Sequence, residues 1–381
     1  MTALILAAIN LRPGITSFAP LIERIAAELG LSRGLISLTT ALPVLLMGLL
    51  APLAPRFAVR FGLERTIAGC MALICLALGL RMFGTNPLVL IATAALVGAG
   101  IAIAGPLLSG FIKRHFLARM GKTAAFYSLS MAVGGTIGVV LTAPATGLLG
   151  DRWTAGLAVW AIPALLALLL WWKLPSQPET AAESGTGLPW RAPRAWLVSI
   201  YFSLQAGLFY ALATWLVARY HEAGFSLLQS NAFFSGFMLI GLPSAFIMPW
   251  LAQRFGNRHL LMAGCGLLAA SCLLLIACRP QAQPLLVCLL LGVALNGTFS
   301  LSLILPMYEA GTPLGVSRLT AMMLCTGYCL ACLSPVLTGM GRDLAGQYQG
   351  PFLVLAGMAG VMTLLALRLA PGRAAADAKL P

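Results

Sequence analysis

Twelve mostly apolar stretches follow one another along the chain, and each is close to the roughly 20 residues that a helix needs to cross a hydrocarbon core. The stretches are continuous rather than alternating, so they predict helices and not the strands of a barrel. Only 9% of the residues are charged, against roughly 25% in soluble domains. We therefore expect an all-α membrane protein. Its twelve transmembrane helices are expected at residues 3–27, 35–57, 66–83, 87–112, 123–148, 154–172, 196–219, 229–250, 260–278, 284–308, 319–340 and 350–369.

One long polar segment divides these stretches into two groups of six. Residues 173–195 are rich in Pro, Ser, Thr, Gly and Glu, a composition that is typical of linkers. The sequence therefore predicts an N-terminal six-helix half at residues 1–172, a cytoplasmic linker at 173–195 and a C-terminal six-helix half at 196–381.

The positive charges predict the orientation of the chain in the membrane. Of the 24 lysines and arginines, sixteen lie in or beside the even-numbered connections and the C-terminal tail, and seven lie at the odd-numbered connections. Basic residues accumulate on the cytoplasmic side, so we expect both termini to be cytoplasmic. The net charge of +14 is dispersed between apolar stretches, so membrane lipid is an expected partner and nucleic acid is not.

The two halves carry an internal repeat. The tripeptide GLS at residues 30–32 corresponds to GFS at 224–226, and RFG at 60–62 is repeated at 254–256. The offset between the members of both pairs is 194 residues. Matching landmarks in a constant register indicate two related six-helix halves, the architecture expected of a carrier that binds its substrate at the interface of the repeats.

The repeated loops resemble a motif of a known family. Residues 59–65 (VRFGLER) and 253–258 (QRFGNR) resemble the D-R-x-G-R-[RK] loop of the major facilitator superfamily. Within that superfamily the chain is similar to the cyanate and 2-nitroimidazole transporter group over nearly its whole length. Three further segments carry this similarity: NLRP at 10–13, IKRHF at 112–116 and QAGLFY at 205–210 with Trp215.

The resemblance implies the major facilitator fold, in which twelve helices form two six-helix halves. It also implies secondary transport of a small solute across a bacterial cytoplasmic (inner) membrane, by alternation between inward-open and outward-open states. The first, fourth, seventh and tenth helices are the ones that usually line the cavity in this superfamily.

The motif loops differ from the family pattern at one position. Val59 and Gln253 stand where the family loop usually has an acid, so a gate latch that relies on that carboxylate is not carried over to this chain. The alternative for the basic residues here is that they are simple cytoplasmic anchors. The gating candidates at the cytoplasmic ends are Arg60, Gly62, Lys113, Arg114, Arg254 and Gly256.

Arg12 is the most informative residue of the sequence because it lies within an apolar stretch. If the first helix enters the membrane near Ala3, nine residues at about 1.5 Å each place Arg12 roughly 13 Å deep. A central arginine costs about 2.5–3.5 kcal/mol on insertion scales, and such residues usually serve function. We expect Arg12 to bind an anionic or electron-rich planar substrate through its planar fork. The alternative is a structural strut that binds helix-end carbonyls.

Other polar and aromatic residues at similar depth are candidate substrate contacts. For each of them, hydrogen bonding between helices or ordinary packing is the competing explanation. The main candidates beside Arg12 are Thr16, Gln205, Phe209, Tyr210 and Asn296, and the weaker ones are Asn10, Tyr127 and Tyr328.

The sequence gives no sign of a cofactor, a metal site or an enzyme. Most of the nine cysteines lie in apolar spans, and the three histidines fall at connections. There is no nucleotide-binding loop and no nucleophile–base constellation, so an intramembrane enzyme is only a distant alternative. We expect a monomer without cofactor or metal.

Energy coupling and substrate charge stay open. An inside-negative potential opposes the entry of a monovalent anion by about 2.3 kcal/mol per 100 mV, and one co-transported proton removes that opposition. No acid is expected in the middle of a span to carry this proton. A neutral solute avoids the problem, and export of neutral nitroheterocycles or other small drugs is the second candidate function.

Overall fold

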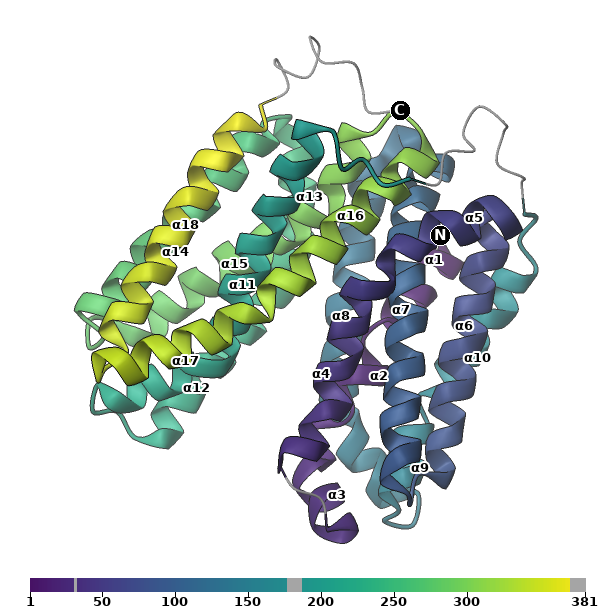
Figure 1. Cartoon of the computed structure of the whole chain (residues 1–381), viewed down its shortest axis with the longest axis horizontal. Coiled ribbons are helices and arrows are strands. Elements are labelled where there is room, and N and C mark those ends of the chain that lie inside the picture. Colours follow the sequence, from purple (N-terminus) through teal and green to yellow (C-terminus); the bar gives the residue numbers. More distant parts are fainter. Residues whose placement is uncertain (31–32, 177–186, 371–381) are drawn as a thin grey trace. The chain divides into compact units, whose positions relative to one another are not determined.

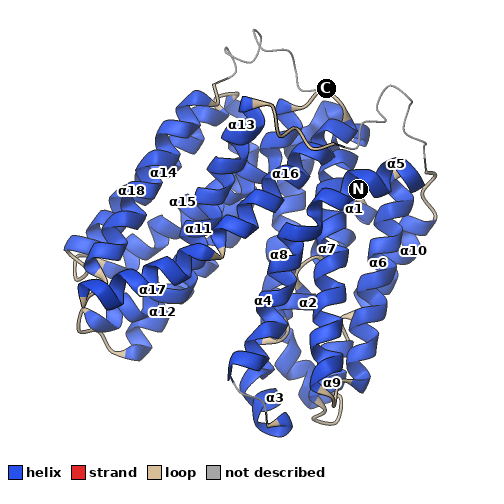
Figure 2. Ribbon diagram, in the orientation of Figure 1, coloured by secondary structure: helices blue, strands red, loops and turns tan. Residues whose placement is uncertain are grey.

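The computed structural model describes residues 1–30, 33–176 and 187–370. The regular elements in these ranges are all helices (Figure 2). Twelve helical segments within these ranges are long and apolar enough to cross a membrane, and each overlaps one of the expected spans. The all-α fold with twelve transmembrane helices is therefore confirmed.

Six spans come from the N-terminal half of the chain (Figure 1). Some of them are interrupted, so the half contains more elements than spans. The elements are α1 (Thr2–Asn10), α2 (Pro13–Thr16), η1 (Ala19–Leu21), α3 (Ile22–Leu29), α4 (Arg33–Leu50), η2 (Ala51–Leu53), α5 (Ala54–Phe61), α6 (Leu63–Leu80), η3 (Arg81–Phe83), α7 (Pro87–His115), η4 (Leu117–Arg119), α8 (Met120–Leu148), α9 (Trp153–Ala158) and α10 (Ala161–Trp172).

The other six spans come from the C-terminal half, where the first helix is continuous and the second and fifth are interrupted. The elements are α11 (Pro193–Glu222), α12 (Leu227–Leu239), α13 (Gly241–Phe255), α14 (Arg258–Cys278), α15 (Pro284–Glu309), α16 (Pro313–Ala331), α17 (Leu333–Ala345) and α18 (Gln349–Arg368).

The contacts between residues divide the chain into two compact units. The first comprises Met1–Pro189 with Gly311–Cys325, and the second comprises Trp190–Ala310 with Thr326–Pro381. The boundary after Pro189 falls within the polar segment that the sequence analysis takes as a linker. The grouping of residues 311–325 with the N-terminal half is a feature that the sequence pattern does not predict.

In both halves the second and third membrane helices pack on the fourth. In the N-terminal half α4 and α6 pack on α7, and α1 packs on α8 and α10. In the C-terminal half α11, α12, α13 and α14 all pack on α15, and α18 packs on α14. This shared packing, together with that of the sixth membrane helix on the third (α10 on α6, α18 on α14), agrees with the internal repeat.

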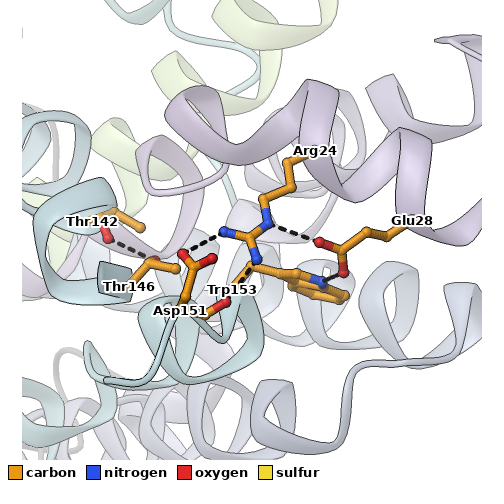
Figure 3. A network of polar contacts seen from close by, with 6 residues as sticks. All are labelled: Arg24, Glu28, Thr142, Thr146, Asp151 and Trp153. Atoms are coloured by element: carbon orange, nitrogen blue, oxygen red, sulfur yellow. Dashed lines mark hydrogen bonds and ion pairs between the residues drawn. The ribbon is translucent and has the colours of Figure 1, made fainter. Parts of the chain in front are cut away.

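A cluster of polar contacts joins α3 to the turn between α8 and α9 (Figure 3). Arg24 forms ion pairs of 2.8 Å with both Glu28 and Asp151, and the indole of Trp153 donates a hydrogen bond of 2.6 Å to Glu28. The hydrogen bonds from Arg24 and then from Trp153 lower the pKa of Glu28. These contacts thus hold α3 against the start of α9, on the side of the membrane that is predicted to face outward.

Candidate functional site

The first membrane helix is broken at Arg12. Helix α1 ends at Asn10 and α2 begins at Pro13, so Leu11 and Arg12 lie between two short helices (Figure 1). Proline causes this break because it has no backbone N–H and its ring clashes with the carbonyl of the preceding turn. Arg12 therefore lies on an interruption midway along an apolar span, and it occupies the N-cap position of α2.

The backbone around Arg12 is bonded to the following turn. The Arg12 carbonyl accepts hydrogen bonds of 3.0 Å from the amides of Ile15 and Thr16, and a third of 3.2 Å from the Thr16 hydroxyl. The Arg12 side chain is half-buried, and Arg12 has a further interaction within the protein. Thr16 thus lies one turn after Arg12 and is bonded to the backbone of Arg12.

Glycines of α8 allow the broken helix to lie close to it. A Cβ atom on Gly134 would be 2.2 Å from the Ile9 carbonyl oxygen, and one on Gly138 would be 3.0 Å from Pro13 Cα. Both distances are shorter than normal contacts of a Cβ atom. The segment that carries Arg12 is therefore packed backbone to backbone against α8, as small residues permit in membranes.

Asn10 links the broken helix to α10. Its side chain is 1% exposed, and its amide nitrogen donates to the carbonyls of Leu6, at 2.8 Å, and Pro163, at 3.0 Å. Both amide hydrogens are thus used within the protein, which favours the packing explanation for Asn10 over a substrate contact.

Arg81 is a buried arginine at the end of the third membrane helix, and the sequence analysis did not single it out. It follows α6, is 0% exposed, and donates a hydrogen bond of 2.8 Å to the carbonyl of Gly14 in α2. The charge count places it with the connections, because a basic residue at the end of an apolar run reads as a surface anchor. Its burial becomes apparent only when the packing is known.

The polar candidates of the C-terminal half lie on α11 and α15. Gln205 is buried, and its amide nitrogen donates to the Leu295 carbonyl at 3.1 Å while its oxygen has no partner among the described residues. Asn296 is half-buried and donates to the Gly292 carbonyl of its own helix at 2.9 Å. Its amide lies against Gly241, where a Cβ would be 2.6 Å from Asn296 Cγ.

The aromatic candidates differ in their surroundings. Phe209 and Tyr210 are half-buried and meet edge to face, with ring centroids 5.7 Å apart. Tyr328 is 4% exposed and packs edge to face on Phe202 at 5.7 Å, and Tyr127 of α8 is 2% exposed. Burial of Tyr127 and Tyr328 agrees with packing as the competing explanation, whereas the partial exposure of the α11 pair leaves room for contact.

A buried ion pair lies where α6 begins and α7 ends. The Glu64 side chain is 1% exposed, and its Oε1 is 3.4 Å from Nη1 of Arg114 and 3.1 Å from Nε2 of His115. Arg114 is therefore a partner of a buried carboxylate and not a simple anchor. Glu64 is not among the site residues that the sequence analysis predicts.

The C-terminal half contains the corresponding pair with the charges reversed. Glu309 at the end of α15 is 3% exposed and lies 3.0 Å from Arg258, which begins α14, and 2.8 Å from Arg194 of α11. Glu64 and Arg258 are 194 positions apart, as are His115 and Glu309. The repeat offset was a signal that could have located these pairs from the sequence.

The remaining gating candidates lie nearby on the same loops. Gly62 (φ 84°) and Gly256 (φ 69°) end α5 and α13 in conformations that favour glycine, as the repeated loop predicts. Arg60 stacks on the ring of Phe61 at 5.2 Å and Arg254 on that of Trp250 at 5.3 Å. Lys113 is half-buried in the last turn of α7.

Comparison with known proteins decides the family. The family model of the Major Facilitator Superfamily matches residues 4–331, which is most of the chain. The chain belongs to the Major Facilitator Superfamily. As a member of this superfamily it is a multi-pass membrane transporter of a small solute, and not an enzyme.

The chain is also similar to individual transporters. It is 30% identical to the cyanate transport protein CynX of Escherichia coli (strain K12), over 98% of this chain and 97% of CynX. It is 28% identical to the 2-nitroimidazole transporter of the same organism, over 96% of this chain and 94% of that protein. The fucose:proton symporter FucP of E. coli, in the outward conformation, has a TM-score of 0.79 over 97% of this chain and 99% of FucP. At 15% identity this last likeness concerns the fold alone.

Proposed function

We propose that this transporter moves a small anionic or electron-rich solute across the bacterial cytoplasmic membrane by alternating access, with the solute bound at Arg12. The observation that carries the proposal is the place of Arg12, on a break midway along the first membrane helix. Ionisable residues at such depth are costly to insert and mark substrate paths in membrane proteins.

The chemistry of arginine supports an anionic or electron-rich ligand. The guanidinium stays charged and donates two parallel hydrogen bonds, which suit the paired oxygens of a carboxylate or nitro group. The half-buried setting of Arg12 strengthens such bonds relative to water, because the local dielectric is low.

The names of the two similar transporters support the same class of solute. Cyanate is a small anion, and a 2-nitroimidazole is a planar ring with a nitro group whose two oxygens carry partial negative charge. Both ligands offer acceptor atoms and no positive charge, which is what a guanidinium binds. We extend this shared chemistry, and not either compound as such, to the present chain.

Residues of the C-terminal half are proposed as further contacts. Gln205 is the strongest of them because its buried amide oxygen has no partner among the described residues and can accept a hydrogen bond. The other proposed contacts are half-buried and not wholly enclosed, and they remain predictions. They are Phe209, Tyr210 and Asn296.

Flux measurements in proteoliposomes test the proposal. We expect Arg12→Gln to lower cyanate flux at least about tenfold, because each lost charged hydrogen bond is worth roughly 1.5–3 kcal/mol. Arg12→Lys should retain intermediate flux, since it keeps the charge and loses the fork. Arg342→Gln is the matched control, because that side chain is 45% exposed. Parental flux in a folded Arg12→Gln variant would contradict the proposal.

A second candidate function is export of neutral nitroheterocycles, which the similarity to the 2-nitroimidazole transporter favours. The two candidates differ in the charge moved per cycle. Movement of an anion alone responds to an imposed voltage, by about 2.3 kcal/mol per 100 mV, whereas anion–proton movement responds to a pH gradient. Flux of 2-nitroimidazole that is insensitive to both voltage and a pH gradient, without competition by cyanate, would favour the second candidate.

A further inference from the structure

The guanidinium of Arg81 is enclosed by the protein at the level of α2. It is 0% exposed, its Cζ lies 4.5 Å from the centre of the Phe18 ring, and its Nη2 donates to the Gly14 carbonyl at 2.8 Å. Within the described residues, its Nε and Nη1 have no hydrogen-bond partner. A buried charge with unused donors is unfavourable for stability by itself, so its presence needs another reason.

The Gly14 carbonyl needs a donor because helix α2 is only four residues long. Helix α2 ends at Thr16 and the chain turns at Ser17 and Phe18, so a regular helical amide is not available to this carbonyl. An unsatisfied carbonyl in a membrane interior costs several kcal/mol. Arg81 supplies the missing donor. The carbonyl that accepts this hydrogen bond belongs to Gly14, two residues after Arg12.

An arginine of the C-terminal half that links the first and third helices, although not at the repeat-equivalent position, binds elsewhere. Arg219 of α11 also connects the first and third helices of its half, and it donates to the carbonyls of Ile276 and Ala277 at 3.1 and 2.8 Å. These are carbonyls at the end of α14, and α11 itself is unbroken over 30 residues. In the N-terminal half the arginine is Arg81, at the end of the third helix. Its guanidinium donates to the Gly14 carbonyl in α2, within the interrupted first helix. The partners of the two arginines therefore differ because the first helix is interrupted in the N-terminal half and continuous in the C-terminal half.

The short helix α2 is held from three sides. Gly138 of α8 lies against Pro13, a Cβ on Gly14 would be 2.6 Å from Val97 of α7, and Arg81 binds the Gly14 carbonyl. Of these three contacts, only the hydrogen bond from Arg81 is directional. A directional bond of this kind can fix the rotation of the turn, whose N-cap position is occupied by Arg12.

We propose that Arg81 is a positioning residue for substrate binding, which it supports by fixing the turn Pro13–Thr16 and with it the backbone of Arg12. This inference rests on the proposed function of Arg12. Arg81 does not contact the substrate, and it acts through the Gly14 carbonyl alone. Its loss should weaken binding at Arg12 and leave the later steps of transport largely intact.

A double-mutant cycle with Arg12 tests this role, with cyanate as the probe in proteoliposomes. Arg81→Met should raise the KM for cyanate by about tenfold and change the maximal rate less than about twofold. Arg81→Lys, which keeps one donor for the Gly14 carbonyl, should recover part of the KM. In an Arg12→Gln background, Arg81→Met should cause no further rise, because the group that it positions is gone.

Arg219→Met is the matched control, since it removes the arginine that ties the same two helices in the other half. It should combine additively with Arg12→Gln. Additive behaviour of Arg81→Met, or a fall in maximal rate without a change in KM, would overturn the positioning role and assign Arg81 to general stability.

Hydrogen exchange separates failure of this inference from failure of the proposed function. In Arg81→Met the amides of Ile15, Thr16 and Ser17, which bond to the carbonyls of Arg12 and Pro13, should exchange faster than in the parent and in Arg81→Lys. If Arg12→Gln transports as the parent does, the proposed function fails whatever the exchange result. If Arg12→Gln loses flux but exchange at these amides is unchanged in Arg81→Met, the inference alone fails. If Arg81→Met does not fold, Arg81→Lys and Arg81→Gln decide by the same measurements.

Discussion

Pro13 and Gly138 together determine where the backbone of Arg12 lies. Proline interrupts the first helix, and the glycine lets α8 approach the interruption to within backbone contact. Arg12 could be found from the sequence because a charge within an apolar run is conspicuous. Arg81 could not, because a basic residue at the end of a span has the same hydropathy whether it faces lipid headgroups or a packed interior.

The close approach at Gly138 gives a prediction for a single methyl group. Gly138→Ala would place Cβ 2.2 Å from the Thr16 hydroxyl oxygen and 3.0 Å from Pro13 Cα, so α2 must move away from α8. We expect a loss of about 1–3 kcal/mol in the free energy of unfolding, together with weaker cyanate binding. Thermal unfolding and binding assays on the purified protein measure both effects.

Gly147→Ala on the same helix is the control. Nothing lies within 4 Å of a Cβ at Gly147, so this change should be neutral or slightly stabilising. Equal stability of the two alanine variants would show that α2 does not depend on close packing against α8.

The helical elements are joined at their ends by ion pairs that hydropathy does not reveal. The spans and their number follow from the length of the apolar runs, and the structure agrees with them. The contacts between ends depend on which helices become neighbours, as with Arg24 of α3 and Asp151 before α9 (Figure 3). A sequence pattern contains the charges but not their partners.

The cluster around Glu28 gives a prediction for pH. Hydrogen bonds from Arg24 and Trp153 lower the pKa of Glu28, so its contribution to stability is present above the unfolded value of about 4.3 and is lost as the pH falls through the lower folded value. Thermal unfolding of Glu28→Gln should therefore differ from that of the parent at pH 7, and the difference should shrink below about pH 4. A difference that stays constant from pH 7 to pH 3 would contradict this assignment. The effect should be modest, because the group is exposed.

In the whole molecule, the internal repeat extends to a buried ion pair in each half, with opposite polarity. The acid lies on the third helix of the N-terminal half, as Glu64, and on the fourth helix of the C-terminal half, as Glu309. The repeat was visible in the sequence as two matching loops. The reversed pairs were not recognised because a comparison by identity overlooks an acid that replaces a base.

Exchanging the polarity of the N-terminal pair tests this correspondence. Glu64→Arg alone should destabilise the protein by roughly 3–5 kcal/mol, because it replaces a paired buried carboxylate by a third basic group beside Arg114 and His115. Adding His115→Glu reproduces the arrangement of the C-terminal half and should restore more than half of the loss. Thermal unfolding of the three proteins in detergent measures this, and equal instability of the single and double variants would contradict the correspondence.

Binding of cyanate to the purified protein tests the role of Arg12 most directly. Unlike a flux in proteoliposomes, it does not depend on energy coupling or on the orientation of the protein in the vesicle. Titration calorimetry should give a dissociation constant for Arg12→Gln that is about a hundredfold above that of the parent, since two charged hydrogen bonds are lost, with Arg12→Lys in between and Arg342→Gln unchanged. A folded Arg12→Gln variant that binds cyanate with parental affinity would contradict the assignment of Arg12 as the substrate-binding residue.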